Sequence, residues 1–402
     1  MSWKRLALFC LHAAGSLGAP LEARCHNATN KLDQLSDTTK PADALAILQE
    51  VVMSNLKLEG RRNTPHGPEC TLENAAVRRD WESLCDDEKK DFIKAVQCLR
   101  EKPSIANPDF AKAARTRYDD LTAVHVNLTN FVHATGSFLT WHRYFVWSFE
   151  TALRDECGYP GYMPYWNWFS HTDDLRKSPL FDGSDTSIGG DGAFYKHNGS
   201  AAFFGSVPIP PAQGGGCIES GPFKDIQATI GPIAAGMYGM EPPVESLHVY
   251  NPRCIRRDLN SKVASKFFTT PNLLNLTIGE ASKTIETFQN EFNGRPQDGG
   301  FMGLHSAGHY TINGENTDFY TSVNDPSFFF HHAMIDKMFW LWQALHPTES
   351  RDVAGTVTLR NTPPMGNATA NDDLIMGVNA PTRKINELMG TMDGSPLCYI
   401  YA

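Results

Sequence analysis

The sequence predicts a mainly α-helical protein with long loops and a few short strands. Apolar residues recur at helical spacing in several segments, most clearly in 74–99 and 326–345. Between such segments, residues 158–260 contain many glycines and prolines and little periodicity, which is typical of loops and short turns. A chain of 402 residues with 41% hydrophobic and 20% charged residues can also build a large globular core.

Residues that start or stop helices bound several of the expected helices. Asn107 and Pro108 suit the N-cap and the first position of one helix, and Gly158 suits the end of another. Asp325 followed by Pro326 suits the start of a third. The expected helices are 74–99, 107 to about 126, 141–156, 280–292, 303–310 and 326–345, and residues 350–402 are expected to be irregular with some strand.

The N-terminus has the pattern of a secretory signal. A short basic stretch, Met1–Arg5, precedes a mostly apolar stretch, Leu6–Leu17, and small residues follow. The pattern predicts a signal peptide over residues 1–20 and a secreted, extracellular protein. No later segment is apolar for 18 residues without interruption, so no membrane span is expected.

The net charge of −9 argues against nucleic acid as a partner. Five glycosylation sequons agree with export and predict a glycoprotein: Asn27, Asn127, Asn198, Asn275 and Asn367.

The cysteine count supports the same compartment. One of the nine cysteines, Cys10, lies in the signal, and an even number remains. An even number in a secreted chain suggests disulfides, although eight cysteines allow 105 pairings. No Cys-x-x-Cys occurs, which disfavours cysteine as a metal ligand. The pairings we expect are Cys25–Cys398, Cys217–Cys254, Cys98–Cys157 and Cys70–Cys85.

Three histidines in the C-terminal half have the arrangement of a metal site. His305 and His309 are four residues apart, so one face of one helix carries both. No Glu follows His305, and the zinc-protease motif is therefore absent. His332 lies on another expected helix, with Asp336 one turn further on to accept its free ring N–H. His331 points about 100° away from His332 and is expected to be a packed residue, or one that supports a ligand, rather than a metal ligand itself.

A second triple lies in the N-terminal half. His125, His133 and His142 are separated by eight and nine residues, which suits two helices and the turn between them. Alone, this spacing is weak evidence, because a lone histidine in an amphipathic helix is more often a core residue. Three imidazoles suit copper or zinc and leave positions open for a further ligand. Two such sites facing each other would make a binuclear centre, and a binuclear copper centre can bind O2.

Longer motifs around these histidines resemble a known family. The segments Phe138–Tyr144 (FLTWHRY) and Asp325–Asp336 (DPSFFFHHAMID) are similar to the two copper regions of the tyrosinase family of type-3 copper proteins. That family includes tyrosinases, catechol oxidases and haemocyanins. Pro164–Trp168 resembles its aromatic segment. Tyr250–Cys254 and Arg256–Leu259 resemble stretches of short secreted fungal catechol oxidases.

The resemblance implies a fold, a cofactor and a reaction. It implies a central four-helix bundle and two copper ions, with O2 as co-substrate in the oxidation of o-diphenols to o-quinones. It implies a single tyrosinase-like catalytic domain over 21–402, without a C-terminal shielding domain, because the chain stops after Tyr399-Ile-Tyr401. Arg78 or Arg79 would stack on these tyrosines. The expected partners are small phenols, with no nucleic acid or membrane, and the expected state is a monomer or weak homodimer. The implied copper A ligands are His125, His133 and His142, and the copper B ligands are His305, His309 and His332.

Several positions depart from the family pattern. Phe131 stands where many relatives carry a cysteine linked to the second copper A histidine, so no thioether is expected on His133. Ser306 and Tyr310 follow two copper B ligands and would shape the entrance to the site, and they favour diphenol oxidation. No Glu occupies the positions just before His305. The residues that could replace a water-orienting acid are Gln297, Asp298 and Glu291, and the choice stays open.

Other functions are compatible with parts of the pattern. Full tyrosinase activity is the main alternative, with monophenol hydroxylation as well as diphenol oxidation. A haemocyanin-like O2 carrier would use the same copper centre without substrate access. A zinc hydrolase would use some of the same histidines, and a secreted structural glycoprotein would use none of them.

Overall fold

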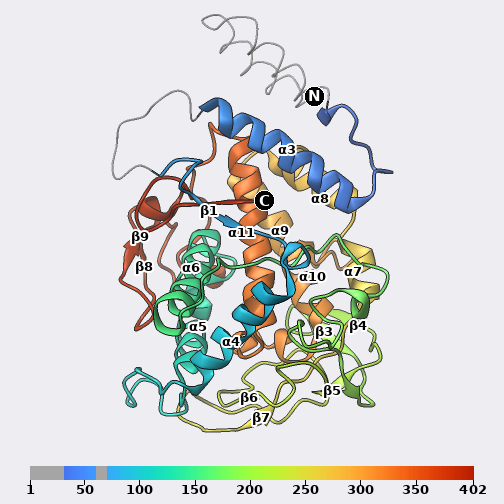
Figure 1. Ribbon diagram of the computed structural model, residues 1–402, viewed down its shortest axis with the longest axis vertical. Helices are drawn as coiled ribbons and strands as arrows, with labels where there is room; N and C mark the ends of the chain where they lie inside the picture. Colours follow the sequence, from blue (N-terminus) through green and yellow to red (C-terminus); the bar gives the residue numbers. More distant parts are fainter. Residues whose placement is uncertain (1–30, 60–69) are drawn as a thin grey trace, which may run out of the picture.

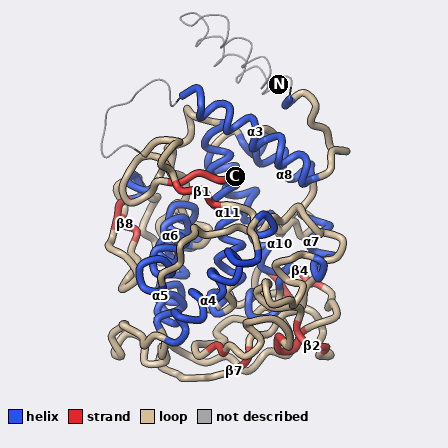
Figure 2. The backbone as a smooth tube through the Cα atoms, in the orientation of Figure 1, coloured by secondary structure: helices blue, strands red, loops and turns tan. Residues whose placement is uncertain are grey.

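Helices form the centre of the molecule, and short strands lie in the loops around them (Figures 1 and 2). The computed structural model describes residues 31–59 and 70–402. The expected mainly α-helical class is confirmed. The signal peptide, Cys25 and Asn27 lie outside the described residues. In chain order the helices are α3 (Pro41–Glu59), α4 (Asp86–Glu101), α5 (Arg117–Val132), α6 (Phe138–Cys157), α7 (Ser261–Phe267), α8 (Thr270–Thr277), α9 (Ile285–Asn293), α10 (Gly303–Ile312) and α11 (Ser327–Leu345).

The strands pair two by two. The one parallel pair among the described strands joins segments far apart in the sequence, with β1 (Ala76–Arg78) beside β10 (Tyr399–Tyr401). The other pairs are antiparallel: β2 (Gly192–Phe194) with β5 (Gly215–Ile218), β3 (Ser200–Ala202) with β4 (Val207–Ile209), β6 (Gln227–Ala228) with β7 (Arg253–Cys254), and β8 (Asp373–Leu374) with β9 (Arg383–Lys384).

Helix α11 is the core of the fold. It runs through the middle of the view in Figure 1, and α6, α10, α8 and α3 pack against it. Almost all of its residues are buried, as expected of a helix that is apolar on every side. The Phe149 ring of α6 stacks on Phe329 of α11 with 3.8 Å between ring centroids, and Phe92 of α4 meets Phe330 edge-on at 5.1 Å. These aromatic contacts fix α4 and α6 relative to α11.

Two expected helices begin later than the sequence indicated. The segment 74–99 starts as strand β1, and α4 begins only after Cys85. Asn107 does not cap a helix, because its side chain accepts the N–H of Asp109 within a single turn. The N-cap of α5 is Thr116, which accepts the N–H of Asp119 while the Asp119 carboxylate accepts the N–H of Thr116.

An ion network ties β1 and β10 to helices α6 and α11. The guanidinium of Arg78 lies 3.7 Å from the centroid of the Tyr399 ring, so Arg78 is the arginine that stacks on the C-terminal tyrosines. Arg79 instead pairs with Glu88. The register of β1 against β10, with Ala76 opposite Tyr399, places the residues before β1 beside Cys398.

This register explains two errors in the expected disulfides. Cys98–Cys157 and Cys217–Cys254 are confirmed. Cys398 pairs with Cys70, which lies just before β1, so Cys25–Cys398 and Cys70–Cys85 are wrong. Cys85, at the start of α4, is exposed and has no disulfide partner within the described ranges 31–59 and 70–402. Among the described residues, no helix is long and apolar enough to cross a membrane.

Candidate metal centre

Four helices bring the six histidines of the sequence analysis together. His125 lies on α5, His133 directly follows α5, and His142 lies on α6. His305 and His309 lie on α10, and His332 lies on α11. The two triples face each other. The rings of His142 and His332 are stacked with 4.4 Å between centroids, and those of His133 and His305 are nearly parallel at 6.4 Å.

The first triple presents free nitrogen lone pairs to one point. Each Nδ1 lies against a backbone carbonyl, which can only accept, so each Nδ1 carries the proton and each Nε2 keeps a lone pair. The Nε2 atoms of His125 and His142 are buried and have no hydrogen-bond partner among the described residues. The Nδ1–O distances are 2.7 Å from His125 to Tyr320, 2.9 Å from His133 to Thr129 and 2.8 Å from His142 to Phe138.

The second triple converges more closely. The Nε2 of His309 lies 3.2 Å from the Nε2 of His305 and 3.3 Å from the Nε2 of His332. The Nδ1 of His305 donates to the side-chain oxygen of Asn293 at 2.7 Å, which leaves its Nε2 as an acceptor. Three imidazole nitrogens around one point are the arrangement that a bound cation requires.

His331 belongs to the same cluster but is directed differently. Its Nε2 donates to the backbone carbonyl of His305 at 3.0 Å, and its ring lies 5.1 Å from Trp168. Helix α10 approaches this ring closely, because a Cβ at Gly308 would lie 2.0 Å from the His331 Cε1. Gly308 therefore lets α10 bring His305 and His309 beside His332.

Burial keeps all six imidazoles neutral. It is the largest cause in each case, and for most of them the neighbouring imidazoles lower the pKa further. The pKa of His133 falls to about 4 and that of His309 to about 3. Near neutral pH these side chains therefore offer lone pairs, and an all-nitrogen donor set without carboxylates suits copper or zinc.

Asp336 does not contact His332, contrary to the sequence-based expectation. Its carboxylate accepts from Arg143 at 2.5 Å, from Arg78 at 3.2 Å, and from the hydroxyls of Tyr399 and Tyr401 at 2.5 and 2.7 Å. Two buried guanidiniums attract a buried carboxylate more strongly than a neutral imidazole N–H does. The Nδ1 of His332 accordingly has no partner among the described residues.

A mostly apolar cleft of about 860 Å³ opens over His133, His305 and His309. Ser306 and Tyr310 line it, as expected. The Ser306 hydroxyl donates to the backbone oxygen of Asn293 at 2.9 Å, and the Tyr310 hydroxyl donates to that of Ala201 at 3.0 Å.

The three candidates for a water-orienting residue differ in whether they line the cleft. Gln297 lines the cleft. Glu291 and Asp298 are not among its lining residues, and both carboxylates pair with Arg295. Only Gln297 of the three is therefore positioned to act on a molecule in the cleft.

Most residues that line the cleft were missed from the sequence, and four of them matter most here: Asn293, Phe204, Phe319 and Arg360. Phe319 lies 4.9 Å from His133 between ring centroids, and Asn293 orients His305. None of these four stands in a motif with a chemical signature. Each comes from a loop or a helix end whose place depends on the tertiary fold.

Two buried imidazole triples that face each other among helices, beneath an apolar cleft, define a binuclear histidine-ligated metalloprotein. Comparison with known proteins identifies the class more closely. The family described as the common central domain of tyrosinase matches residues 115–345. The chain belongs to the tyrosinase family, whose members have a binuclear copper centre that uses O2.

Several proteins are similar to this chain over most of its length. A tyrosinase-like protein, orsC, from Emericella nidulans is 38% identical over 337 residues, which cover 80% of this chain and 88% of the relative. Tyrosinase P from Aspergillus terreus is 36% identical over 343 residues, which cover 83% of this chain and 93% of the relative. A polyphenol oxidase structure from Thermothelomyces thermophila is 33% identical with a TM-score of 0.79, covering 92% of this chain and all of that chain.

Proposed function

We propose that this protein oxidises o-diphenols to o-quinones with O2 as co-substrate, at two copper ions held by the six histidines. His125, His133 and His142 would hold one copper, and His305, His309 and His332 would hold the other. The observation that carries the proposal is the convergence of unprotonated Nε2 atoms from two facing triples beneath an open cleft. In the balanced reaction two diphenols and one O2 give two quinones and two waters.

The protein's own residues orient and protect this centre. When bound, the copper pair would accept two electrons from each diphenol and pass electrons to O2. Backbone carbonyls hold the Nδ1 protons of His125, His133 and His142, and Asn293 holds that of His305, which aims the Nε2 atoms of these four rings inward. Phe328 stacks on His332 at 4.0 Å, and Phe138 lies 4.7 Å from His305 between ring centroids. These rings exclude water from the rear of the site and leave the cleft as the approach.

The cleft favours diphenols over monophenols. A monophenol must lose its only hydroxyl proton and then be attacked at a ring carbon, which calls for a base beside the site. The hydroxyls of Ser306 and Tyr310 already donate to backbone carbonyls. Asp318, the one carboxylate lining the cleft, accepts four backbone N–H groups. A catechol needs no such base, because its two hydroxyls become more acidic as they bind copper.

Full tyrosinase activity is the second candidate. Tyrosinase P, one of the relatives, bears that name, and Gln297 lines the cleft, where it could orient a water toward a monophenol. The two candidates differ in one measurement, the initial rates on 4-methylphenol and 4-methylcatechol with copper-loaded protein. Diphenol oxidation alone gives fast turnover of the catechol and slow or lagging turnover of the phenol. Comparable rates without a lag favour tyrosinase.

We also propose that the protein is secreted and glycosylated. Three disulfides among the described residues fit an oxidising compartment. Asn127, Asn198 and Asn367 are exposed and can accept a glycan. Asn275 is half-buried, and its Nδ2, the atom to which a glycan would be attached, donates to Glu291, so a glycan there would crowd that contact. Glycopeptide mapping is therefore expected to find sugar on the first three and none on Asn275.

A further inference from the structure

We propose that Arg360 binds a carboxylate on the substrate's side chain, so that the preferred substrates are diphenols with an anionic side chain rather than simple catechols. The inference rests on the proposed diphenol oxidation and adds the chemical class of the substrate. A cleft of about 860 Å³ is far larger than one aromatic ring needs, so it has room for a side chain beyond the ring.

Of the described residues that line the cleft, Arg360 is the one Lys or Arg. Its guanidinium makes no hydrogen bond or ion pair with the residues that the structure describes, and its one ring contact is with Phe204, 5.5 Å from the ring centroid. Asp318, the only acid of the cleft wall, is already held by backbone N–H groups. The cleft thus offers one cation without an anionic partner, which suits an anionic ligand.

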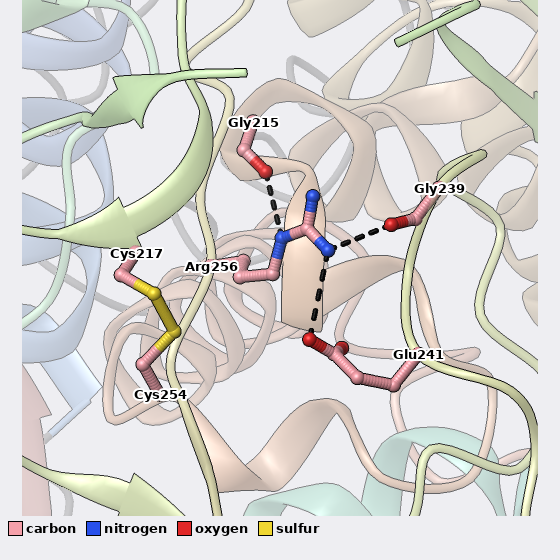
Figure 3. The surroundings of a disulfide bond; sticks show 6 residues. All are labelled: Gly215, Cys217, Gly239, Glu241, Cys254 and Arg256. Atoms are coloured by element: carbon pink, nitrogen blue, oxygen red, sulfur yellow. Dashed lines mark hydrogen bonds and ion pairs between the residues drawn. A yellow bond between two sulfur atoms is a disulfide. The ribbon is translucent and has the colours of Figure 1, made fainter. Parts of the chain in front are cut away.

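A second arginine, Arg256, is held by contacts within the protein, as Figure 3 shows. The Arg256 guanidinium donates to the backbone oxygens of Gly215 and Gly239, both at 2.7 Å, and pairs with Glu241. Arg256 follows Cys254, which is bonded to Cys217. These contacts anchor the loop that carries Tyr238 into the cleft wall. The wall is therefore held in place, and Arg360 is left as the cation available to a ligand.

The backbone at the mouth of the cleft is constrained on both sides. Phe203 and Phe204 have φ of 51° and 56°, and Arg360 and Asn361 have φ of 54° and 51°. Non-glycine residues rarely occupy this left-handed region, and where they do, surrounding contacts hold them. The Asn361 side chain accepts the N–H groups of Met365 and Gly366, which fixes the turn that presents Arg360.

A path of ring contacts leads from the histidines to Arg360. The Phe319 ring lies 4.9 Å from His133 and 5.5 Å from Phe204, whose ring in turn lies under the Arg360 guanidinium. A diphenol ring at the histidines would send its side chain along Phe319 and Phe204. Because several contacts separate Arg360 from His133, the carboxylate must lie at the end of a chain of carbons rather than on the ring itself.

The test compares substrates of equal shape and different charge. The probes are 3-(3,4-dihydroxyphenyl)propanoate, its neutral amide and 3,4-dihydroxybenzoate, with wild type and Arg360→Asn. Asn tolerates left-handed backbone, so this change removes the charge with little new strain. Arg351→Gln is the matched control, since Arg351 is an exposed arginine outside the cleft.

Arg360→Asn should lower kcat/KM for the propanoate about fivefold, mostly through KM, as expected of a partly exposed ion pair. The amide and the benzoate should change less than twofold, and Arg351→Gln should leave all three unchanged. The wild-type preference for the propanoate over the amide should also shrink as salt rises, because salt screens such a pair. This salt response tests the charge even if the variant folds poorly.

The experiment distinguishes a failure of the proposed role of Arg360 from a failure of the proposed diphenol oxidation. If wild type oxidises propanoate and amide equally at low salt, or if Arg360→Asn lowers both alike, the role of Arg360 is refuted while diphenol oxidation stands. If copper-loaded wild type oxidises none of the three probes, the proposed function itself has failed.

Discussion

Asp336→Asn tests the ion network that ties β1 and β10 to helices α6 and α11. The wild-type carboxylate accepts from Arg78, Arg143, Tyr399 and Tyr401, and both arginine side chains are fully buried. An amide carries no charge, and its NH2 group would face donors. Removing one partner of a buried ion pair costs about 3–5 kcal/mol of unfolding free energy. At roughly 2 °C per kcal/mol for a large chain, Tm should fall by about 6–10 °C.

The control is another acid–arginine pair in a different environment. Asp393 pairs with Arg351, and both side chains are exposed, at 40% and 58%. Asp393→Asn should therefore cost less than about 1 kcal/mol. Thermal unfolding followed by circular dichroism measures both variants, and metal analysis of the folded protein measures their copper. Asp336→Asn should keep two coppers per chain. A variant of unchanged Tm that loses one copper would refute the reasoning and restore Asp336 as a partner of His332.

The stability that the same network contributes should depend on pH. Burial raises the pKa of Asp336, but the charges of Arg143 and Arg78 outweigh it and hold that pKa below its usual value. The folded-state pKa lies below the unfolded value of about 3.9. The ionised Asp336 carboxylate therefore contributes its full share of the unfolding free energy above about pH 4, and this share is lost as the pH falls toward the folded-state pKa. Wild type should therefore lose part of its advantage over Asp336→Asn below about pH 4.

Three further changes test the site and the covalent structure. His332→Ala should leave about one copper per chain by metal analysis. His331→Ala should keep two, because the His331 Nε2 donates to a backbone carbonyl. The reverse result would make His331 the copper ligand instead of His332. Ser306→Asn should raise the ratio of monophenol to diphenol initial rates, since an amide offers both donors and an acceptor to orient a water, whereas the one proton of the Ser306 hydroxyl is already donated to Asn293. Peptide mapping without reduction should find Cys70 linked to Cys398, and any other partner for Cys398 would contradict the structure.

The sequence predicted elements whose signals are local. Helix α6 ends at Gly158, whose φ of 70° is the left-handed conformation that glycine favours. Helix α11 begins where Asp325 accepts the N–H of Ser327, close to the expected start. The packing of His331 also followed from its angle to His332 on one helix. These features depend on neighbours within a turn or two, so spacing and residue type were sufficient.

Features that depend on distant segments could not be predicted in this way. Cys398 pairs with Cys70 because β1 and β10 lie side by side, and no local pattern encodes that contact. Asp336 has the spacing of a histidine partner, but two arginines from other segments attract it instead. Arg360 is brought to the mouth of the cleft by a turn in an irregular segment. In each case tertiary contacts override the local pattern.

A single oxygen-electrode experiment tests the central claim most directly. Protein loaded to two coppers per chain is given 4-methylcatechol and, separately, 4-methylphenol, and initial O2 uptake is recorded beside quinone absorbance. The account predicts immediate uptake with the catechol, at one O2 for every two quinones, and slow or lagging uptake with the phenol. No uptake with the catechol in fully loaded protein would contradict diphenol oxidation, and equal rates without a lag would make the protein a full tyrosinase.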